Sequence, residues 1–194
     1  PSNWDGSGKH CIDFNSSTLV YDNIFWEVPQ QLCLVPIQNA TVLTGGLLYN
    51  GSGAFTFHHW YWVKELRMSK VSSSSLQSKS LVDKSFVSFI QIWQNRFQHI
   101  AFDTYPKSKI LCSLLMQKTD MGILVTGELQ RDLIIESCTS LEKERFIFVE
   151  KETFSASSIA ASIWKPNAEY KMGLIPPSSI ASLGSQTSRG DKVL

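Results

Sequence analysis

The chain lacks both an excess of charge and any long apolar run. Its 194 residues carry a formal net charge of +1 and only 18% of them are charged, so the concentrated basic patch typical of a nucleic-acid surface is missing. No apolar run reaches the roughly 18 residues that a membrane-spanning helix needs. Because 43% of the residues are hydrophobic, the chain has ample material for a core. These features predict a globular protein of one large domain or two small ones, with no nucleic-acid partner.

Several signals of chemistry are also missing. The sequence contains no P-loop, G-x-G-x-x-G, H-E-x-x-H or G-x-S-x-G motif, and no D-x-D of the kind used by metal-dependent transferases. Its four cysteines show no C-x-x-C spacing, so a zinc or dithiol motif has no support. We therefore predict no metal and no bound cofactor.

The two ends of the sequence suggest further segments. The first residue is not methionine and no signal peptide follows it. We expect Pro1 to mark a processed or trimmed start, which leaves room for a membrane anchor upstream. The last residues, GDKVL, open an apolar run that has no partner, so we expect a further strand and a second domain after Leu194.

The cysteines allow two interpretations. Cys11 and Cys33 lie in the loop-rich N-terminal part and are able to pair in an oxidising compartment. Cys112 and Cys138 fall in predicted helices, where we expect buried free thiols.

Sequons bear on the compartment as well. Three N-x-S/T sequons begin at Asn15, Asn39 and Asn50. In a eukaryotic source they favour the lumen of the secretory pathway, in the Golgi or the endoplasmic reticulum. In a bacterial source they carry no meaning, and a cytoplasmic location is then expected.

Composition divides the chain into three parts. Residues 1–63 hold an irregular lead-in and short apolar runs broken by turn residues, including the hairpin signal Asn50-Gly51, which predicts a small antiparallel β layer packed on the main domain. Residues 64–84 are rich in Ser and Lys, which is typical of a mobile loop. Residues 85–194 alternate strands with helices, which predicts parallel βαβ units.

The last part yields the following elements. We expect strands at Phe86–Trp93, Ile123–Thr126 and Arg145–Glu150, and a short one within Thr153–Trp164. We expect helices at Asn95–Lys118, kinked at Pro106, at Glu128–Leu141, with Leu129, Leu133 and Ile134 inward, and at Pro176–Leu183.

The strongest candidate for a site lies between Phe86 and Lys107. Phe86–Trp93 is nearly all apolar, which is typical of a strand buried on both faces of a parallel sheet. In a helix that begins at Asn95, the polar residues Asn95, His99 and Asp103 follow one another at i, i+4 steps and share a face. The opposite face, which would dock on the sheet, holds Phe97, Ile100, Ala101 and Tyr105. The polar triplet therefore lies just past the carboxyl end of a buried strand, where ligands bind in open α/β sheets.

The same residues carry a family resemblance. Asn95, Phe97, His99, Asp103, Pro106 and Lys107 form the pattern N-x-F-x-H-x-x-x-D-x-x-P-K. This pattern resembles the N-x-F-H-x-x-x-D-x-L-P-R signature of glycosyltransferase family 61. Two departures are that His99 lies one residue late and that Tyr105 replaces the usual leucine. The order of strands and helices from Phe86 to Leu194 is similar to that family as well.

The resemblance implies a fold and an activity. The fold is the N-terminal, acceptor-side half of a GT-B enzyme, with a Rossmann-like parallel sheet and flanking helices. The activity is an inverting transfer of a sugar from a nucleotide-sugar donor to a hydroxyl of a glycan or glycoprotein, without a metal. A missing C-terminal domain would bind the nucleotide sugar, so we expect the fragment alone to be inactive.

Roles follow for the candidate residues. In an inverting transfer, a base must take the proton of the acceptor hydroxyl as it attacks the anomeric carbon. Either His99 is this base and Asp103 orients it, or Asp103 is the base. Asn95 and Lys107 are the candidate substrate-binding residues.

Other interpretations stay open. His99 and Asp103 also match an ordinary ion pair on a helix surface, and Asn95 matches an N-cap. The aromatic run Phe55–Trp62 fits a buried strand or a sugar-stacking surface, so a non-catalytic carbohydrate-binding or structural α/β domain is the main alternative. A different enzyme that uses His99 and Asp103 is a third, although no nucleophile with suitable spacing is evident.

Overall fold

The computed structural model of the chain describes residues 4, 8–13, 31–42, 48–50, 53–56, 82–90, 97, 100–149, 154–165 and 173–175. In chain order, its elements are β1 (His10–Asp13), β2 (Gln31–Val42), β3 (Leu48–Asn50), β4 (Gly53–Thr56), β5 (Val82–Ser88), a π-helix (Ile100–Thr104), α3 (Tyr105–Gln117), β6 (Gly122–Val125), α4 (Glu128–Ser137), a 3-10 turn (Lys143–Arg145), β7 (Phe146–Phe148), β8 (Phe154–Lys165) and β9 (Gly173–Ile175).

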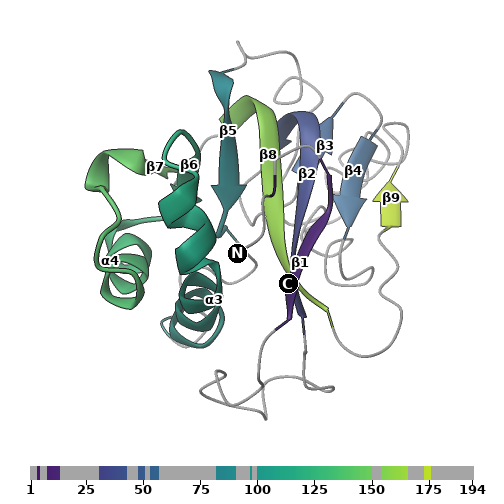
Figure 1. The fold of residues 1–194 in the computed structure, drawn as a ribbon. Coiled ribbons are helices and arrows are strands. Elements are labelled where there is room, and N and C mark those ends of the chain that lie inside the picture. The colour runs from purple at the N-terminus through teal and green to yellow at the C-terminus, as the bar shows by residue number, and fades with distance from the viewer. Residues whose placement is uncertain are drawn as a thin grey trace, which may run out of the picture.

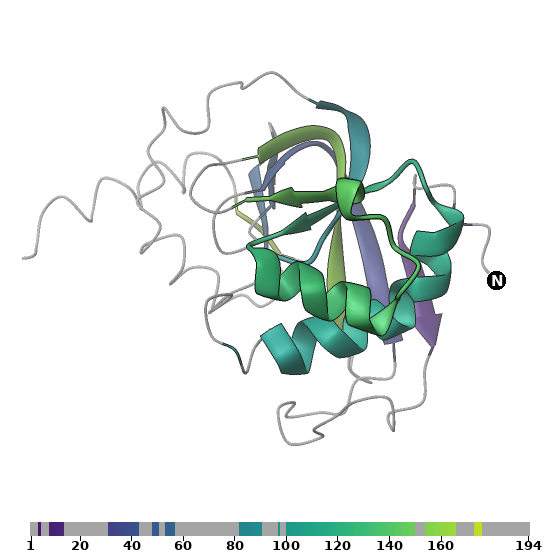
Figure 2. The ribbon, with the colours of Figure 1, turned by 90° about the vertical axis from the view of Figure 1, so that its left-hand side faces the viewer.

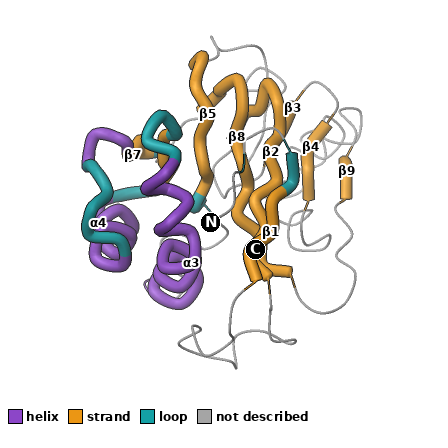
Figure 3. The backbone as a smooth tube through the Cα atoms, in the orientation of Figure 1, coloured by secondary structure: helices purple, strands orange, loops and turns teal. Residues whose placement is uncertain are grey.

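The described strands form one mixed sheet, which makes the architecture α/β. Nine strands take part, in the order β7-β6-β5-β8-β2-β3-β4-β9, and β1 pairs with β2 outside this path. Figure 1 shows the sheet running from β7 and β6 on one side to β4 and β9 on the other, and Figure 3 shows the same arrangement by type of element. The expected α/β class is confirmed, but the sheet is not parallel throughout.

Parallel pairing is confined to four strands. β5 pairs in parallel with β6 and with β8, and β6 pairs in parallel with β7. Helices lie in the connections from β5 to β6 and from β6 to β7, as the alternation of strands and helices predicted. The link from β7 to β8 holds only residues 149–153, so it has no room for a crossover helix. This short link departs from a regular Rossmann pattern.

The remaining strands are antiparallel. β2 pairs with β8 over almost its whole length, from Gln31 opposite Lys165 to Val42 opposite Phe154. The predicted hairpin is confirmed, since β3 and β4 pair antiparallel with Asn50 opposite Gly53. The N-terminal strands were expected to form a layer beside the main domain. They instead continue the same sheet, because the long pairing of β2 with β8 satisfies both backbones.

Two strands have bounds that differ from those predicted, because pairing with neighbouring strands extends them beyond their apolar residues. The first parallel strand was predicted at Phe86–Trp93, but β5 spans Val82–Ser88. Val82, Asp83 and Lys84 are exposed, and two of the three are charged. The sequence analysis therefore assigned them to the Ser/Lys-rich loop. They are extended because β8 lies alongside them. The strand within Thr153–Trp164 is likewise longer than expected, since it pairs on both sides.

The two helices cover one face of the sheet. Figure 2 shows α3 and α4 lying side by side against the strands. The core beneath them combines β5 and β6 residues with the inward faces of the helices, among them Val87, Phe89, Ile123, Leu111, Leu115 and Ile134. In α3, Leu111, Leu114 and Leu115 keep the expected i, i+3, i+4 stripe. In α4, by contrast, Leu129 is 47% exposed, so its expected inward position is wrong.

The opposite face of the sheet is buried as well. It carries a second cluster to which Phe86, Ile90, Leu124 and Ile159 belong. Alternate residues of β5 thus enter different clusters, with Phe86 on one face and Val87 on the other. This double burial explains the apolar residues at the end of β5 and just after it, Phe86, Val87, Phe89 and Ile90.

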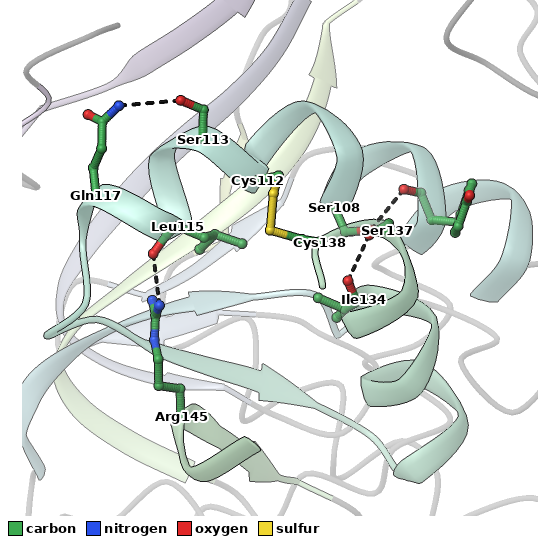
Figure 4. Close-up of a disulfide and its surroundings, with 10 residues drawn as sticks. Ser108, Cys112, Ser113, Leu115, Gln117, Ile134, Ser137, Cys138 and Arg145 are labelled. Carbon is green, nitrogen blue, oxygen red and sulfur yellow. Dashed lines mark hydrogen bonds between the residues drawn. A yellow bond between two sulfur atoms is a disulfide. The ribbon is translucent and has the colours of Figure 1, made fainter. Parts of the chain in front are cut away.

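All four cysteines of the chain form disulfides. Cys11 and Cys33 lie opposite each other on β1 and β2 and are bonded, as the sequence allowed. Cys112 on α3 is bonded to Cys138 at the end of α4, with the two Cα atoms 5.5 Å apart (Figure 4). The expectation of free thiols at Cys112 and Cys138 is therefore wrong. The sequence analysis considered the hydrophobic pattern of each helix separately. It could not show that the packing of α3 against α4 brings Cys112 and Cys138 within bonding distance.

Candidate functional site

The candidate site lies where two neighbouring parallel strands end. β5 and β6 leave the sheet side by side, with Ser88 opposite Leu124, and the backbone N–H of Phe89 donates to the carbonyl of Leu124 at 3.0 Å. The π-helix and the N-terminus of α4 follow these strand ends. This is the carboxyl edge at which the sequence predicted a ligand site.

A single buried side chain ties this corner together. Gln130, in the first turn of α4, has no exposed surface. Its amide nitrogen donates to the carbonyl of Phe89 and to the hydroxyl of Thr104, both at 2.9 Å. Its amide oxygen accepts from the backbone N–H and the hydroxyl of Thr126, at 2.9 and 3.2 Å. These bonds use the two donors and two lone pairs of the amide, so the group is fully satisfied.

Asp103 and Lys107 lie next to this network and bind each other. The ammonium nitrogen of Lys107 is 2.9 Å from Oδ2 of Asp103, and the two side chains are 8% and 18% exposed. Asp103 belongs to the π-helix and Lys107 to the first turn of α3. A carboxylate placed before the lysine at i, i+4 is the favourable order for such a pair. The pair holds a carboxylate in a defined place at the carboxyl edge.

The helix that carries Asp103 is not the regular one that the sequence predicted. Phe97 is α-helical, residues Ile100–Thr104 form a π-helix, and α3 begins at Tyr105. Pro106 accounts for the change, since proline is accepted in a first turn but disrupts a helix interior. A π-helix advances by i to i+5 bonds, so the assumption of 100° per residue fails here.

The predicted residues therefore have different outcomes. Asn95 and His99 lie outside the described residues. Asp103 and Lys107 are brought together, and the ammonium of Lys107 is engaged by a carboxylate. Phe97 was expected to dock on the sheet, but its side chain is 62% exposed.

Gln130 and Thr104 were missed by the sequence analysis. A signal for Gln130 was available, because the buried positions of α4 follow the spacing 130, 134 and 138. Reading the stripe from Ile134 backwards places Gln130 inward and Leu129 outward. The sequence analysis overlooked Gln130 because its side chain is polar, and a buried amide is expected only where hydrogen-bond partners exist.

A second buried cation lies away from this edge. Arg145 is 6% exposed, and its guanidinium donates to the carbonyls of Leu115, Lys118 and Met121 at 2.8 to 3.1 Å. It thereby caps the C-terminus of α3, where a cation is favoured (Figure 4). Burial lowers the pKa of Arg145 from its ordinary value, while Glu142 and Asp120 act in the opposite direction. Its donors all face backbone, so its part is structural.

Two kinds of feature are absent from the described residues. Within the ranges that the structure describes, no three His, Cys, Asp or Glu side chains come together as a metal site would require. Neither of the helices described has the length and apolar character of a membrane span.

Comparison with known proteins gives no relative. No protein-family model, no curated protein and no solved structure matches this chain.

Proposed function

We propose that this chain is the acceptor-side α/β domain of an inverting glycosyltransferase that transfers a sugar from a nucleotide-sugar donor to a hydroxyl of a glycan or glycoprotein. The proposal begins from the resemblance carried by Asn95, His99, Asp103 and Lys107. The parallel part of the sheet is compatible with it. Across the sheet these four strands follow the order β7-β6-β5-β8, which is third, second, first and fourth in the chain, and the first four strands of a doubly wound sheet have the same order. The Rossmann-like, GT-B assignment is part of the proposal.

One observation carries the proposal further than the motif alone. The carboxylate of Asp103 is held at the carboxyl edge of β5 and β6 by an ion pair 2.9 Å long. Thr104, the residue after it, is fully buried and bonded to Gln130. A carboxylate that is fixed on both sides in this way loses little conformational freedom when it takes part in chemistry.

The ion pair of Asp103 with Lys107 supports one division of roles. A carboxylate that is already bound to an ammonium group is suited to orienting a neighbouring imidazole, whose free nitrogen then takes the acceptor proton. We therefore assign proton abstraction to His99 and its orientation to Asp103. Lys107 acts through Asp103 in this scheme, so the expected contact of Lys107 with substrate is replaced by a positioning role. Asn95 remains a candidate for binding the acceptor. The donor site belongs to the other half of the enzyme, and no metal or bound cofactor is proposed.

Sugar transfer by the complete gene product tests the proposal. A panel of labelled nucleotide sugars is offered with glycan and glycoprotein acceptors, and Asp103→Asn and His99→Gln are compared with the parent protein. Losing a general base or its orienting carboxylate typically costs 10²- to 10⁴-fold in rate, so kcat is expected to fall by about 10²-fold or more in both variants.

The matched control is Asp132→Asn on α4. Asp132 also pairs with a cation, Arg131 at 2.8 Å, but it is 59% exposed and contributes none of the hydrogen bonds described above for Gln130. Its substitution is expected to leave kcat within twofold. Transfer that survives His99→Gln unchanged would refute the proposed chemistry, even if Asp103→Asn proved too unstable to assay.

A non-catalytic carbohydrate-binding or structural domain is the second candidate. The observation in its favour is that Asp103 and Lys107 satisfy each other in a largely buried pair, as structural ion pairs do. The exposed aromatic surface that would distinguish a binding module, Trp60 and Trp62, lies outside the described residues. Binding of glycans without any transfer by the complete gene product would favour this candidate.

A further inference from the structure

Regular strand pairing is interrupted on both sides of β8 in the middle of the sheet, away from the carboxyl edge. Ser157 of β8 lies between two neighbours that break regular pairing. On the β5 side, the register shifts between Val82 and Ser85, and the hydroxyl of Ser157 donates to Asp83 at 3.1 Å. On the β2 side, Gln38 and Ala40 pair with β8 but Asn39 does not. The register is unchanged across Asn39, so one residue is distorted and none is inserted.

Among these residues, Asn39 has the most unusual backbone conformation. Its φ of 48° lies in the left-handed region, and it is the only non-glycine residue with positive φ in the part of the chain that the structure describes. Its side chain is exposed, as is that of Gln38, although both belong to a strand in the centre of the sheet.

Within the described part of the chain, β2 is also unpaired along part of its second edge. β1 covers β2 only at residues 31–34, and β3 covers it only at residues 41 and 42. Between them, the far edge of β2 has no strand alongside it among the described residues. Asn39 is thus exposed, on a stretch of β2 that has β8 along one edge and no other described strand along the second.

We propose that Asn39 is the acceptor of an N-linked oligosaccharide. Asn39, Ala40 and Thr41 form a complete sequon. The two disulfides fit an oxidising compartment, and the lumen of the endoplasmic reticulum, in which such glycans are attached, is one such compartment. Nδ2 of Asn39 forms a bond to the anomeric carbon of a lipid-diphosphate-linked oligosaccharide. The bond from that carbon to the diphosphate breaks, the lipid diphosphate leaves with the electron pair, and the amide releases one proton.

The neighbouring sequon is less suited to carry a glycan in the folded protein. Asn50 is only half-exposed, and its Nδ2 donates to the carbonyl of Gln38 at 3.3 Å. That bond satisfies a carbonyl on the open stretch of β2, which gives Asn50 a structural part. The sequon at Asn15 lies outside the described residues.

Four variants separate glycosylation from a purely conformational need for asparagine at position 39. Asn39→Gly removes the acceptor and keeps a residue that adopts positive φ readily. Thr41→Val destroys the sequon and leaves Asn39 in place, whereas Thr41→Ser preserves it. Because the Thr41 hydroxyl also bonds the hydroxyl of Ser155 at 2.7 Å, Ser155→Ala removes that bond without touching the sequon.

The experiment uses the full chain, expressed in eukaryotic cells behind a cleavable secretion signal. Peptide-N-glycosidase treatment in heavy-oxygen water marks each formerly glycosylated asparagine as labelled aspartate, which peptide mass spectrometry locates. We expect label at position 39 in the parent, Thr41→Ser and Ser155→Ala proteins. We expect it to be lost in Thr41→Val, and Asn39→Gly to lack the corresponding mobility step on a gel. A secreted, folded parent protein without label at Asn39, or label that persists in Thr41→Val, would overturn the proposal.

Discussion

At the scale of single residues, Gly122 is constrained by the ring of Phe86. The two residues are partners on the parallel strands β6 and β5, and a Cβ at position 122 would overlap the Phe86 ring. Phe86 is 1% exposed and so has little space into which it can move. Glycine is therefore required here by close approach and not by backbone conformation.

Gly122→Ala is accordingly expected to lower the free energy of unfolding by about 1–3 kcal/mol, the usual cost of overpacking a core. Urea denaturation followed by circular dichroism measures the change. Gly127→Ala is the matched control, because a Cβ at Gly127 meets nothing within 4 Å. The cost should shrink when Phe86→Leu is added, since the two positions are then no longer in conflict. Equal stability of the two alanine variants would contradict this account.

A substitution of Lys107 tests whether its ion pair with Asp103 stabilises the folded protein. Lys107→Met removes the ammonium group from a largely buried carboxylate, so we expect a loss of about 3 kcal/mol in the free energy of unfolding. Lys109→Met serves for comparison, because Lys109 is exposed and its ammonium lies 4.9 Å from the Tyr105 ring centroid. That contact is worth about 0.5–1 kcal/mol. A smaller cost for Lys107→Met than for Lys109→Met would show that the pair adds no stability.

At the scale of elements, Gln130 connects the ends of β5 and β6 with the π-helix and α4. Gln130→Leu removes partners from the Phe89 carbonyl, the Thr104 hydroxyl and the Thr126 N–H. Each buried polar group left unsatisfied costs about 1–3 kcal/mol, so a total loss of about 3 kcal/mol or more is expected. Hydrogen exchange of the residues at the strand ends should accelerate with it.

Gln117→Leu is the control for this network. Gln117 is exposed and its amide bonds only the Ser113 hydroxyl, at 3.3 Å. A surface change of this kind is expected to alter stability by less than about 0.5 kcal/mol. If both leucine variants have the same stability, the buried network does not hold the corner together.

The disulfide between α3 and α4 is the other link at this scale. It closes a loop with a sequence separation of 26 residues. In the chain-entropy view, such a loop stabilises the folded state by about 3–4 kcal/mol. The double variant Cys112→Ala, Cys138→Ala should therefore unfold at lower urea concentration than the parent, and mass spectrometry of the non-reduced parent should show the cross-linked peptide pair. Free thiols at both positions in the oxidised, folded protein would contradict the structure.

At the scale of the whole molecule, β8 joins the parallel and antiparallel parts of the sheet. It pairs with β5 on one side and with β2 on the other. Because both parts share this strand, neither has a sheet edge at which it could separate without breaking a long ladder. We expect one cooperative unfolding transition, with coincident midpoints by circular dichroism and tryptophan fluorescence. Two resolved transitions would show that the N-terminal strands fold as a unit of their own.

The sequence predicted much of the secondary structure but few of the contacts between its elements. Apolar periodicity found the carboxyl-terminal end of β5, β6 and the inward stripe of α3, since these signals reflect burial directly. It misplaced the ends of β5 and the phase of the helix before Tyr105, where pairing with β8 and the position of Pro106 decide the conformation. At the candidate site, it found Asp103 and Lys107 but not their pairing or Gln130.

By itself, the sequence determined the α/β class, the burial of its central strand on both faces and the place of the candidate site after that strand. These follow from composition and from periods of 2 and 3.6 residues, which depend only on local backbone geometry. Only the tertiary structure decided that the N-terminal strands continue the main sheet, that Cys112 meets Cys138, and that Gln130 bonds the end of β5. Each of these depends on two segments arriving at the same place, and no local pattern encodes that meeting.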